Sequence, residues 1–262
     1  MEWLAYLLIG MLAGLFAGLF GIGGGIVIVP ALIFVLTTFQ ISDVFIPHQA
    51  IATSLATIIG TAAAATVAHH RRGAVHWKIV KVLTPGILLG TWFGASAASW
   101  LSDWWLIHLF GVFLIIIAWQ LFQQPTIITQ QRSFPKTNVI ITVGAVIGAV
   151  SAVIGIGGGT LTVPFLVRHQ INIRNAIATS SACGIPIAIA GSISFIIHGW
   201  QQPELPPHSL GFIYWPAAVA IMMTSIPMAT VGTRLAHRIA VTALKRWFSI
   251  VLVLIALKLL LQ

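Results

Sequence analysis

A glycine-rich motif occurs twice in this chain and has the composition of an anion-binding turn. Gly21-Ile22-Gly23-Gly24-Gly25 recurs as Gly155-Ile156-Gly157-Gly158-Gly159, and Val-Pro follows each copy after three intervening residues. Glycine permits positive φ and tight turns, and it costs a helix interior roughly 1 kcal/mol relative to alanine. A helix that begins after such a turn directs free N–H groups and its positive dipole end forward. The motifs are predicted to be the tips of re-entrant or broken helices that meet near the midplane, and two such helix starts facing each other would bind an anion without buried Lys or Arg.

The glycines have a second interpretation, because small residues also allow membrane helices to pack closely. Close packing suffices to explain Gly10, Gly14 and Gly18, and Gly86, Gly90 and Gly94 as well. A nucleotide-binding loop is excluded, because no Lys follows the glycines and no strand precedes them. We favour substrate binding for the duplicated motif, and the predicted residues are Gly21, Gly23, Gly24, Gly25, Gly155, Gly157, Gly158 and Gly159.

A second repeated patch is rich in hydroxyl groups. Residues 50–54 (AIATS) recur as residues 176–180. The hydroxyls can donate to anion oxygens, and equally they can bond to the carbonyls of their own helix, which is common in membrane helices. Both readings stay open, and the polar residues before each patch could cap a helix or reach a cavity. The predicted substrate-binding side chains are Thr53, Ser54, Thr57, Thr179, Ser180, Ser181, Gln49 and Asn175.

The composition shows which elements must position these groups. Of 262 residues, 58% are hydrophobic and 6% are charged, whereas a soluble domain has about 25% charged residues. The chain is therefore predicted to be an all-α polytopic membrane protein in contact with the lipid bilayer. Its net charge of +9 then marks cytoplasmic loops, so no nucleic-acid partner is expected. The lone Cys183 offers no disulfide framework and no paired metal ligands, and no cofactor is expected.

Ten apolar stretches divide into two sets of five. The polar stretch Gln123–Lys136 separates the sets, which predicts a first membrane repeat at 1–124, a cytoplasmic linker at 125–137 and a second repeat at 138–262. The seventh stretch, Thr160–Val167, is too short to cross alone, because a span needs about 20 residues. The predicted segments are Trp3–Phe20, Ile22–Thr38, Ala50–His69, Ile79–Trp100, Leu106–Phe122, Val139–Ile154, Thr160–Val167, Ala176–Ile197, Phe212–Leu235 and Leu244–Leu261.

The charged residues test this segment count. If the chain changes side at each segment, twelve of the thirteen Lys and Arg residues fall on one side and all four acids on the other, with Lys258 as the exception. By the positive-inside rule the basic side is cytoplasmic. This pattern predicts a multi-pass protein of the cytoplasmic membrane with both termini outside. Because each repeat has an odd number of crossings, the second repeat is predicted to be inverted, as in secondary transporters with a substrate site at the midplane.

The paired GIGGG-x-x-x-VP motifs, each followed by an AIATS-type helix start, resemble the sulfite exporter TauE/SafE family of membrane permeases. The resemblance spans both halves of the chain. It implies a secondary carrier for sulfur-containing anions or organosulfonates, with the glycine motifs and the Thr/Ser helix starts as the substrate region. It does not specify the anion, the direction of transport or the oligomeric state.

Other function classes are weighed against this one. A passive anion channel could use the same glycine motifs. An enzyme is not expected, because the sequence has no HExxH, no GxSxG and no paired intramembrane carboxylates. Since no Asp or Glu lies within a predicted span, coupling through an intramembrane carboxylate is not expected either. If a proton takes part, the substrate can carry it, since sulfite titrates near neutrality.

Overall fold

The computed structural model describes residues 2–21, 23–122, 135–236 and 242–261. Within them the chain is an all-α polytopic membrane protein, and seven of the described helices are long and apolar enough to cross a membrane. One short β hairpin joins α8 to α9. The elements are α1 (Glu2–Phe20), α2 (Gly25–Thr38), α3 (Ile46–His70), α4 (Trp77–Trp100), α5 (Asp103–Phe122), α6 (Thr137–Ile154), α7 (Gly159–Arg168), α8 (Ile173–Gly199), β1 (Ser209–Leu210), β2 (Ile213–Tyr214), α9 (Trp215–Ala236) and α10 (Thr242–Leu260).

The ten predicted segments correspond in order to these helices. Most boundaries agree within three residues, and the largest difference is that α3 begins at Ile46 instead of Ala50. The short seventh segment is the short helix α7. Most of the predicted linker lies outside the described residues, and α6 begins at Thr137. The domain limits therefore stay predictions.

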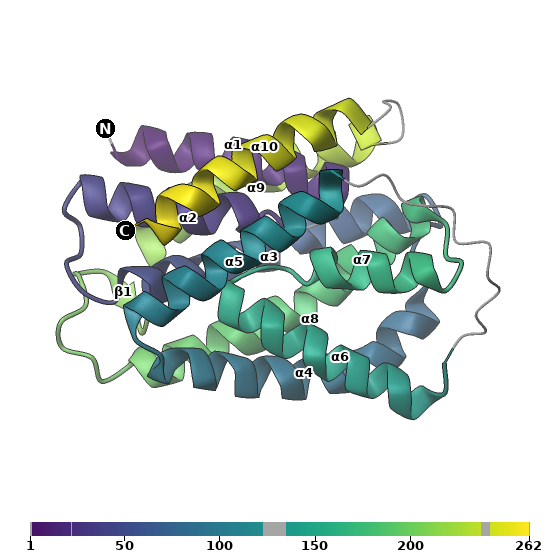
Figure 1. Cartoon of the computed structure of the whole chain (residues 1–262), viewed down its shortest axis with the longest axis horizontal. Helices are drawn as coiled ribbons and strands as arrows, with labels where there is room; N and C mark the ends of the chain where they lie inside the picture. Colours follow the sequence, from purple (N-terminus) through teal and green to yellow (C-terminus); the bar gives the residue numbers. More distant parts are fainter. Residues whose placement is uncertain (1, 22, 123–134, 237–241, 262) are drawn as a thin grey trace.

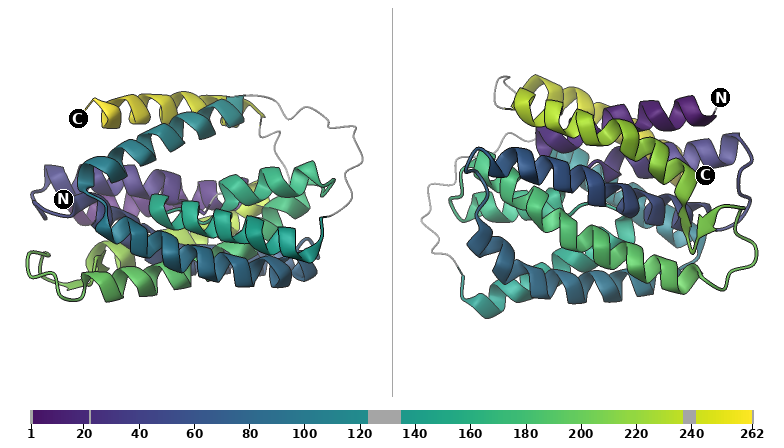
Figure 2. Two further views of the ribbon diagram at one scale, coloured as in Figure 1. Left: turned by 60° about the horizontal axis from the view of Figure 1, so that its bottom comes forward. Right: turned by 180° about the vertical axis from the view of Figure 1, so that it is seen from behind.

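Helices from the two halves pack against each other in pairs. α1 lies along α9, α4 along α6, α3 against α8, and α5 against α10. Figure 2 shows the α5–α10 pair side by side along one edge of the bundle. In the sequence repeat, α1 to α5 correspond to α6 to α10, so exchanging each helix for its counterpart leaves this set of pairs unchanged. The inversion of the second repeat itself stays a prediction.

Small residues make two of these pairings close. A Cβ atom at Gly14 would lie 2.7 Å from the Cα of Ser225 on α9, and one at Gly94 would lie 2.7 Å from the Cα of Ala149 on α6. Gly10, Gly18, Gly86 and Gly90 face the backbone of the same neighbours. The close-packing interpretation of these six glycines is thus confirmed.

Both chain ends and the β hairpin lie at one end of the molecule (Figure 1). We call this the outer end, because the charge pattern predicts it to be outside, and the opposite end the inner end. α2 extends from the middle of the bundle toward the outer end, whereas α7 extends toward the inner end (Figure 1). The glycine motifs immediately precede these two helices.

Candidate functional site

The two glycine motifs touch in the middle of the bundle. A Cβ atom at Gly23 would lie 2.7 Å from the Cα of Gly157, and one at Gly157 would lie 3.0 Å from the Cα of Gly23. Such a separation leaves no room for side chains. Gly23 also has φ +83°, a conformation that glycine adopts without steric cost. The segments at 21–25 and 155–159, here called the first and second Gly loops, are therefore in backbone contact.

Each Gly loop ends in a helix start that carries no side-chain cap. The cap residues are Gly24, with φ +72°, for α2 and Gly158, also with φ +72°, for α7. The first N–H groups of an α-helix have no intrahelical partner, and they lie at the positive end of the helix dipole. The structure thus brings two helix N-termini together, one from each half of the chain.

Each Gly loop is contacted by one serine from the other half of the protein. The hydroxyl of Ser54 on α3 donates to the carbonyl of Gly155 at 2.8 Å. The hydroxyl of Ser180 on α8 lies 3.3 Å from the carbonyl of Gly21 and 2.9 Å from the carbonyl of Ile177 in its own helix, so its single hydrogen is shared between the two. Ser54 and Ser180 occupy matching positions in the repeat, as Gly155 and Gly21 do. The two contacts are therefore related by the repeat, and they connect the second Gly loop to α3 and, more weakly, the first Gly loop to α8.

Two threonines of the repeated patch bond to the segments that precede α9 and α4, at opposite ends of the molecule. Thr53 accepts a hydrogen bond at 3.0 Å from the N–H of Tyr214, which immediately precedes α9. Thr179 accepts one at 3.0 Å from the N–H of His76, which immediately precedes α4. We call the first bond the outer contact and the second the inner contact. They too are related by the repeat, since α4 and α9 are counterparts.

The other predicted side chains use their donors within the protein. The hydroxyl of Thr57 donates to the carbonyl of Ser54 at 2.7 Å, and that of Ser181 donates to Ile177 at 3.0 Å. Both therefore bond to their own helix, as one of the two sequence interpretations predicted. Asn175 bonds to the His76 ring at 3.0 Å.

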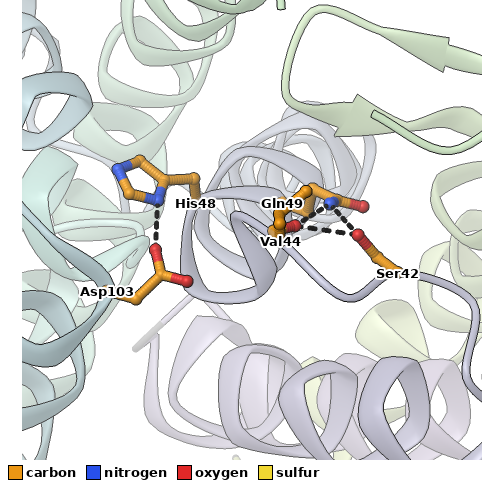
Figure 3. Close-up of polar contacts among 5 residues, drawn as sticks. All are labelled: Ser42, Val44, His48, Gln49 and Asp103. Carbon is orange, nitrogen blue, oxygen red and sulfur yellow. Dashed lines mark hydrogen bonds and ion pairs between the residues drawn. The ribbon is translucent and has the colours of Figure 1, made fainter. Parts of the chain in front are cut away.

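The amide of Gln49 is directed away from the Gly loops. Its Nε2 donates to the hydroxyl of Ser42 at 2.6 Å and to the carbonyl of Val44 at 2.9 Å (Figure 3). These bonds fix the turn between α2 and α3. Gln49 thus positions the start of α3.

In the described part of the site, backbone N–H groups and helix dipoles are available to bind an anion. An apolar cavity of about 710 Å³ lies elsewhere, between α1, α2 and α10, and none of the predicted substrate-binding residues lines it. Because the Gly loops touch, the structure has the loops closed on each other. A bound anion would require the loops to separate.

One polar pair near the outer end was missed by the sequence analysis. His48 is 1% exposed, and its Nδ1 lies 3.0 Å from Oδ1 of Asp103 (Figure 3). Asp103 had been placed between spans, whereas it is the first residue of α5. Sequence position could have indicated the pair. His48 directly precedes Gln49, and the topology places both His48 and Asp103 at outer ends of segments.

Comparison with known proteins identifies relatives along the whole chain. The sequence model described as Sulfite exporter TauE/SafE matches residues 6–259. A probable membrane transporter protein of Haemophilus influenzae is 36% identical over 98% of this chain and 97% of its own length. YunE of Bacillus subtilis, also named a probable membrane transporter protein, is 30% identical over 76% of this chain and 80% of its own. MJ0441 of Methanocaldococcus jannaschii, with the same description, is 27% identical over 94% of this chain and 91% of its own. No solved structure matches.

Proposed function

The chain belongs to the sulfite exporter TauE/SafE family and is a membrane transporter, and on that premise we propose that it carries a small sulfur-containing oxyanion across the cytoplasmic membrane. Sulfite and organosulfonates are the favoured substrates. The observation that carries this proposal is the contact between two uncapped helix starts, one from each half. Backbone N–H groups and dipole ends bind oxyanions at helix N-termini.

We further propose that transport proceeds by alternating access of the two halves around the Gly loops. The set of helix pairs is unchanged when counterparts are exchanged, which supports two halves with equivalent roles. Both the outer and the inner contacts are formed in this structure, so it corresponds to a closed state. Opening toward the outside would break the bond to Thr53, and opening toward the inside would break the bond to Thr179.

The proposal is tested by flux measurements with the purified full chain in proteoliposomes. Sulfite, sulfate, thiosulfate and short alkanesulfonates are supplied outside, and protein-free liposomes are the control. We expect saturable uptake of at least one sulfur oxyanion. Uptake of none of them above the protein-free rate would contradict the proposed substrate class.

A passive anion channel is the alternative mechanism. The same proteoliposomes distinguish the two, because a carrier loaded with unlabelled substrate inside accelerates labelled uptake from outside. A pore shows no such trans-stimulation. Uptake that rises linearly with concentration and does not depend on the internal substrate would contradict a carrier and support a channel.

The orientation stays part of the proposal. We infer that the end with the β hairpin and both termini faces outward, because the acids gather there and the bases gather at the opposite end. A protease-sensitive tag after Gln262 tests this in intact spheroplasts. Cleavage from outside is expected, and cleavage only after membrane disruption would reverse the orientation.

A further inference from the structure

We propose that His48 and Asp103 form a proton-binding site that makes anion binding from the outer side depend on the external pH. The inference rests on the proposed anion transport and concerns how external pH regulates it. His48 is in the first turn of α3 and Asp103 is the first residue of α5. The pair therefore joins a central helix of the bundle to the α5–α10 edge.

The geometry identifies where the proton binds. A carboxylate only accepts hydrogen bonds, so the Nδ1 that lies 3.0 Å from Asp103 carries a hydrogen. The neutral ring then has its lone pair on Nε2. That atom is buried and has no hydrogen-bond partner among the described residues. Nε2 of His48 is thus an open acceptor, and a proton can bind there without breaking the bond to Asp103.

The surroundings of the pair favour this role. The ring of Phe212 is stacked on the imidazole with centroids 5.1 Å apart, and Phe45 meets it edge-on at 5.5 Å. An aromatic face stabilises a cation. The side chain of Asp103, in contrast, is 42% exposed. Water therefore reaches the carboxylate side of the pair, whereas a proton reaches the buried Nε2 when the packing around the ring opens.

Other titratable groups at the outer end have different partners or lie on other segments. His108, on α5, uses Nδ1 to donate to the carbonyl of Trp104, and His198, on α8, uses Nδ1 toward Ser194. Asp103 is the carboxylate within ion-pair distance of His48 in the part of the chain that the structure describes. The remaining groups on neighbouring elements are Glu2, Asp43, Glu204, His208, Tyr214 and Lys258.

The charge of the pair decides its effect on an anion. With His48 neutral and Asp103 ionised the pair carries −1, and proton binding brings it to zero. Ser54, which holds the second Gly loop, is six residues further along α3, which is about 9 Å at the helical rise. One unit charge at that distance changes the binding of a monovalent anion on the order of tenfold at an effective dielectric constant near 20. Anion binding should therefore strengthen as the external pH falls.

The two halves differ at this position. Asn175 matches Gln49 in the repeat, so the counterpart of His48 is Arg174. Arginine keeps its charge over the physiological pH range, whereas histidine changes charge between about pH 5 and 8. The pH response that depends on His48 is therefore expected at the outer end.

The experiment measures uptake of methanesulfonate, whose single charge does not change over the range tested. Proteoliposomes hold a fixed internal pH, and the external pH is varied from about 6 to about 8.5 across the histidine range. For the wild type, the apparent affinity should rise on the order of tenfold toward acid. Asp103→Asn removes the negative charge and changes the two charge states of the pair from −1 and 0 to 0 and +1, so its affinity should exceed that of the wild type at every pH. His48→Gln leaves the carboxylate charged, so its affinity should be low at every pH.

The control variant is His108→Gln, because His108 is on the same helix as Asp103 and bonds only to its own helix. It should keep the wild-type pH profile. A pH response that survives in His48→Gln overturns the inference. A change of affinity in the same direction in His48→Gln and Asp103→Asn overturns it as well. Either result would leave the proposed anion transport intact.

Absence of uptake of every sulfur oxyanion by the wild type would instead contradict the proposed function. The proton site is then tested directly by NMR of histidine-labelled protein in detergent. The His48 resonance, assigned by its loss in His48→Gln, should change its chemical shift with pH, and this response should differ in Asp103→Asn. A resonance that does not titrate overturns the inference.

Discussion

Contact between the Gly loops can be separated from glycine's conformational freedom by three single substitutions. Gly23→Ala adds a methyl group at a residue with φ +83° whose Cβ would lie 2.7 Å from the Cα of Gly157. Gly157→Ala adds one at ordinary φ, 3.0 Å from the Cα of Gly23. Gly73→Ala, in the turn between α3 and α4, has φ +65° and nothing within 4 Å. Gly23→Ala therefore introduces both backbone strain and a close contact, Gly157→Ala a close contact alone, and Gly73→Ala backbone strain alone.

The expected magnitudes follow from these distances. Placing alanine in the left-handed region costs about 1–2 kcal/mol, so Gly23→Ala and Gly73→Ala should lose similar thermal stability from strain. Non-bonded carbon atoms prefer separations of about 3.5 Å or more, so a methyl group at Gly23 must push the loops apart by roughly 1 Å. A hydrogen bond to a charged group contributes about 1.5–3 kcal/mol. Misplacing one donor should therefore weaken anion binding on the order of tenfold or more.

The assay combines proteoliposome uptake with the unfolding midpoint in detergent. We expect Gly73→Ala to transport like the wild type despite its strain. Gly157→Ala should lose uptake with little loss of stability beyond the displaced loop, and Gly23→Ala should lose both. Equal uptake by Gly23→Ala, Gly157→Ala and the wild type would refute the view that the contacting loops bind the substrate.

The remaining predictions concern the hydrogen bonds that surround the loops. Ser54→Ala removes a bond of 2.8 Å and Ser180→Ala one of 3.3 Å, so the first should raise the apparent KM for uptake several-fold more than the second; equal effects would remove the link between these bonds and the site. Thr53→Val removes the outer contact, and Thr179→Val removes the inner contact. External substrate should therefore bind more tightly to Thr53→Val and more weakly to Thr179→Val, which the ratio of the KM for uptake to the KM for efflux measures. Shifts in the same direction would contradict alternating access around these contacts. Cys183 is fully buried, and we expect it to resist a membrane-permeant maleimide in the native protein; rapid labelling would place a water path along α8.

Hydropathy and charge predicted the helices well, because a bilayer demands long apolar segments. The largest boundary error, at α3, has a physical cause. Its first turn holds Pro47, His48 and Gln49, which are polar or helix-breaking by type but buried here. Proline is tolerated in a first helical turn, and the two polar side chains have partners. A hydropathy criterion cannot distinguish such residues from a loop.

The Gly loops could be predicted from sequence, but their hydrogen-bond partners could not. Glycine content and spacing are local properties, and they indicated both loops and the helix starts after them. The partner of Ser54 is 101 residues away, and that of Ser180 is 159 residues away. Their pairing depends on how the two halves pack, which no local pattern encodes. The same reason hid the pair of His48 and Asp103, whose residues are 55 positions apart.

The repeat also explains what the two halves can and cannot contribute to a direction of transport. The backbone contact of the Gly loops, the serine bonds and the threonine contacts all occur in counterpart pairs, so under the proposed alternating access we expect them to make similar contributions to the outward-open and inward-open states. A preference for one direction must then come from groups that the repeat does not duplicate. The pair of His48 and Asp103 at the outer end, opposite Arg174 in the second half, is such a difference. We therefore expect gradients of protons and substrate to set the direction, while the duplicated contacts allow movement either way.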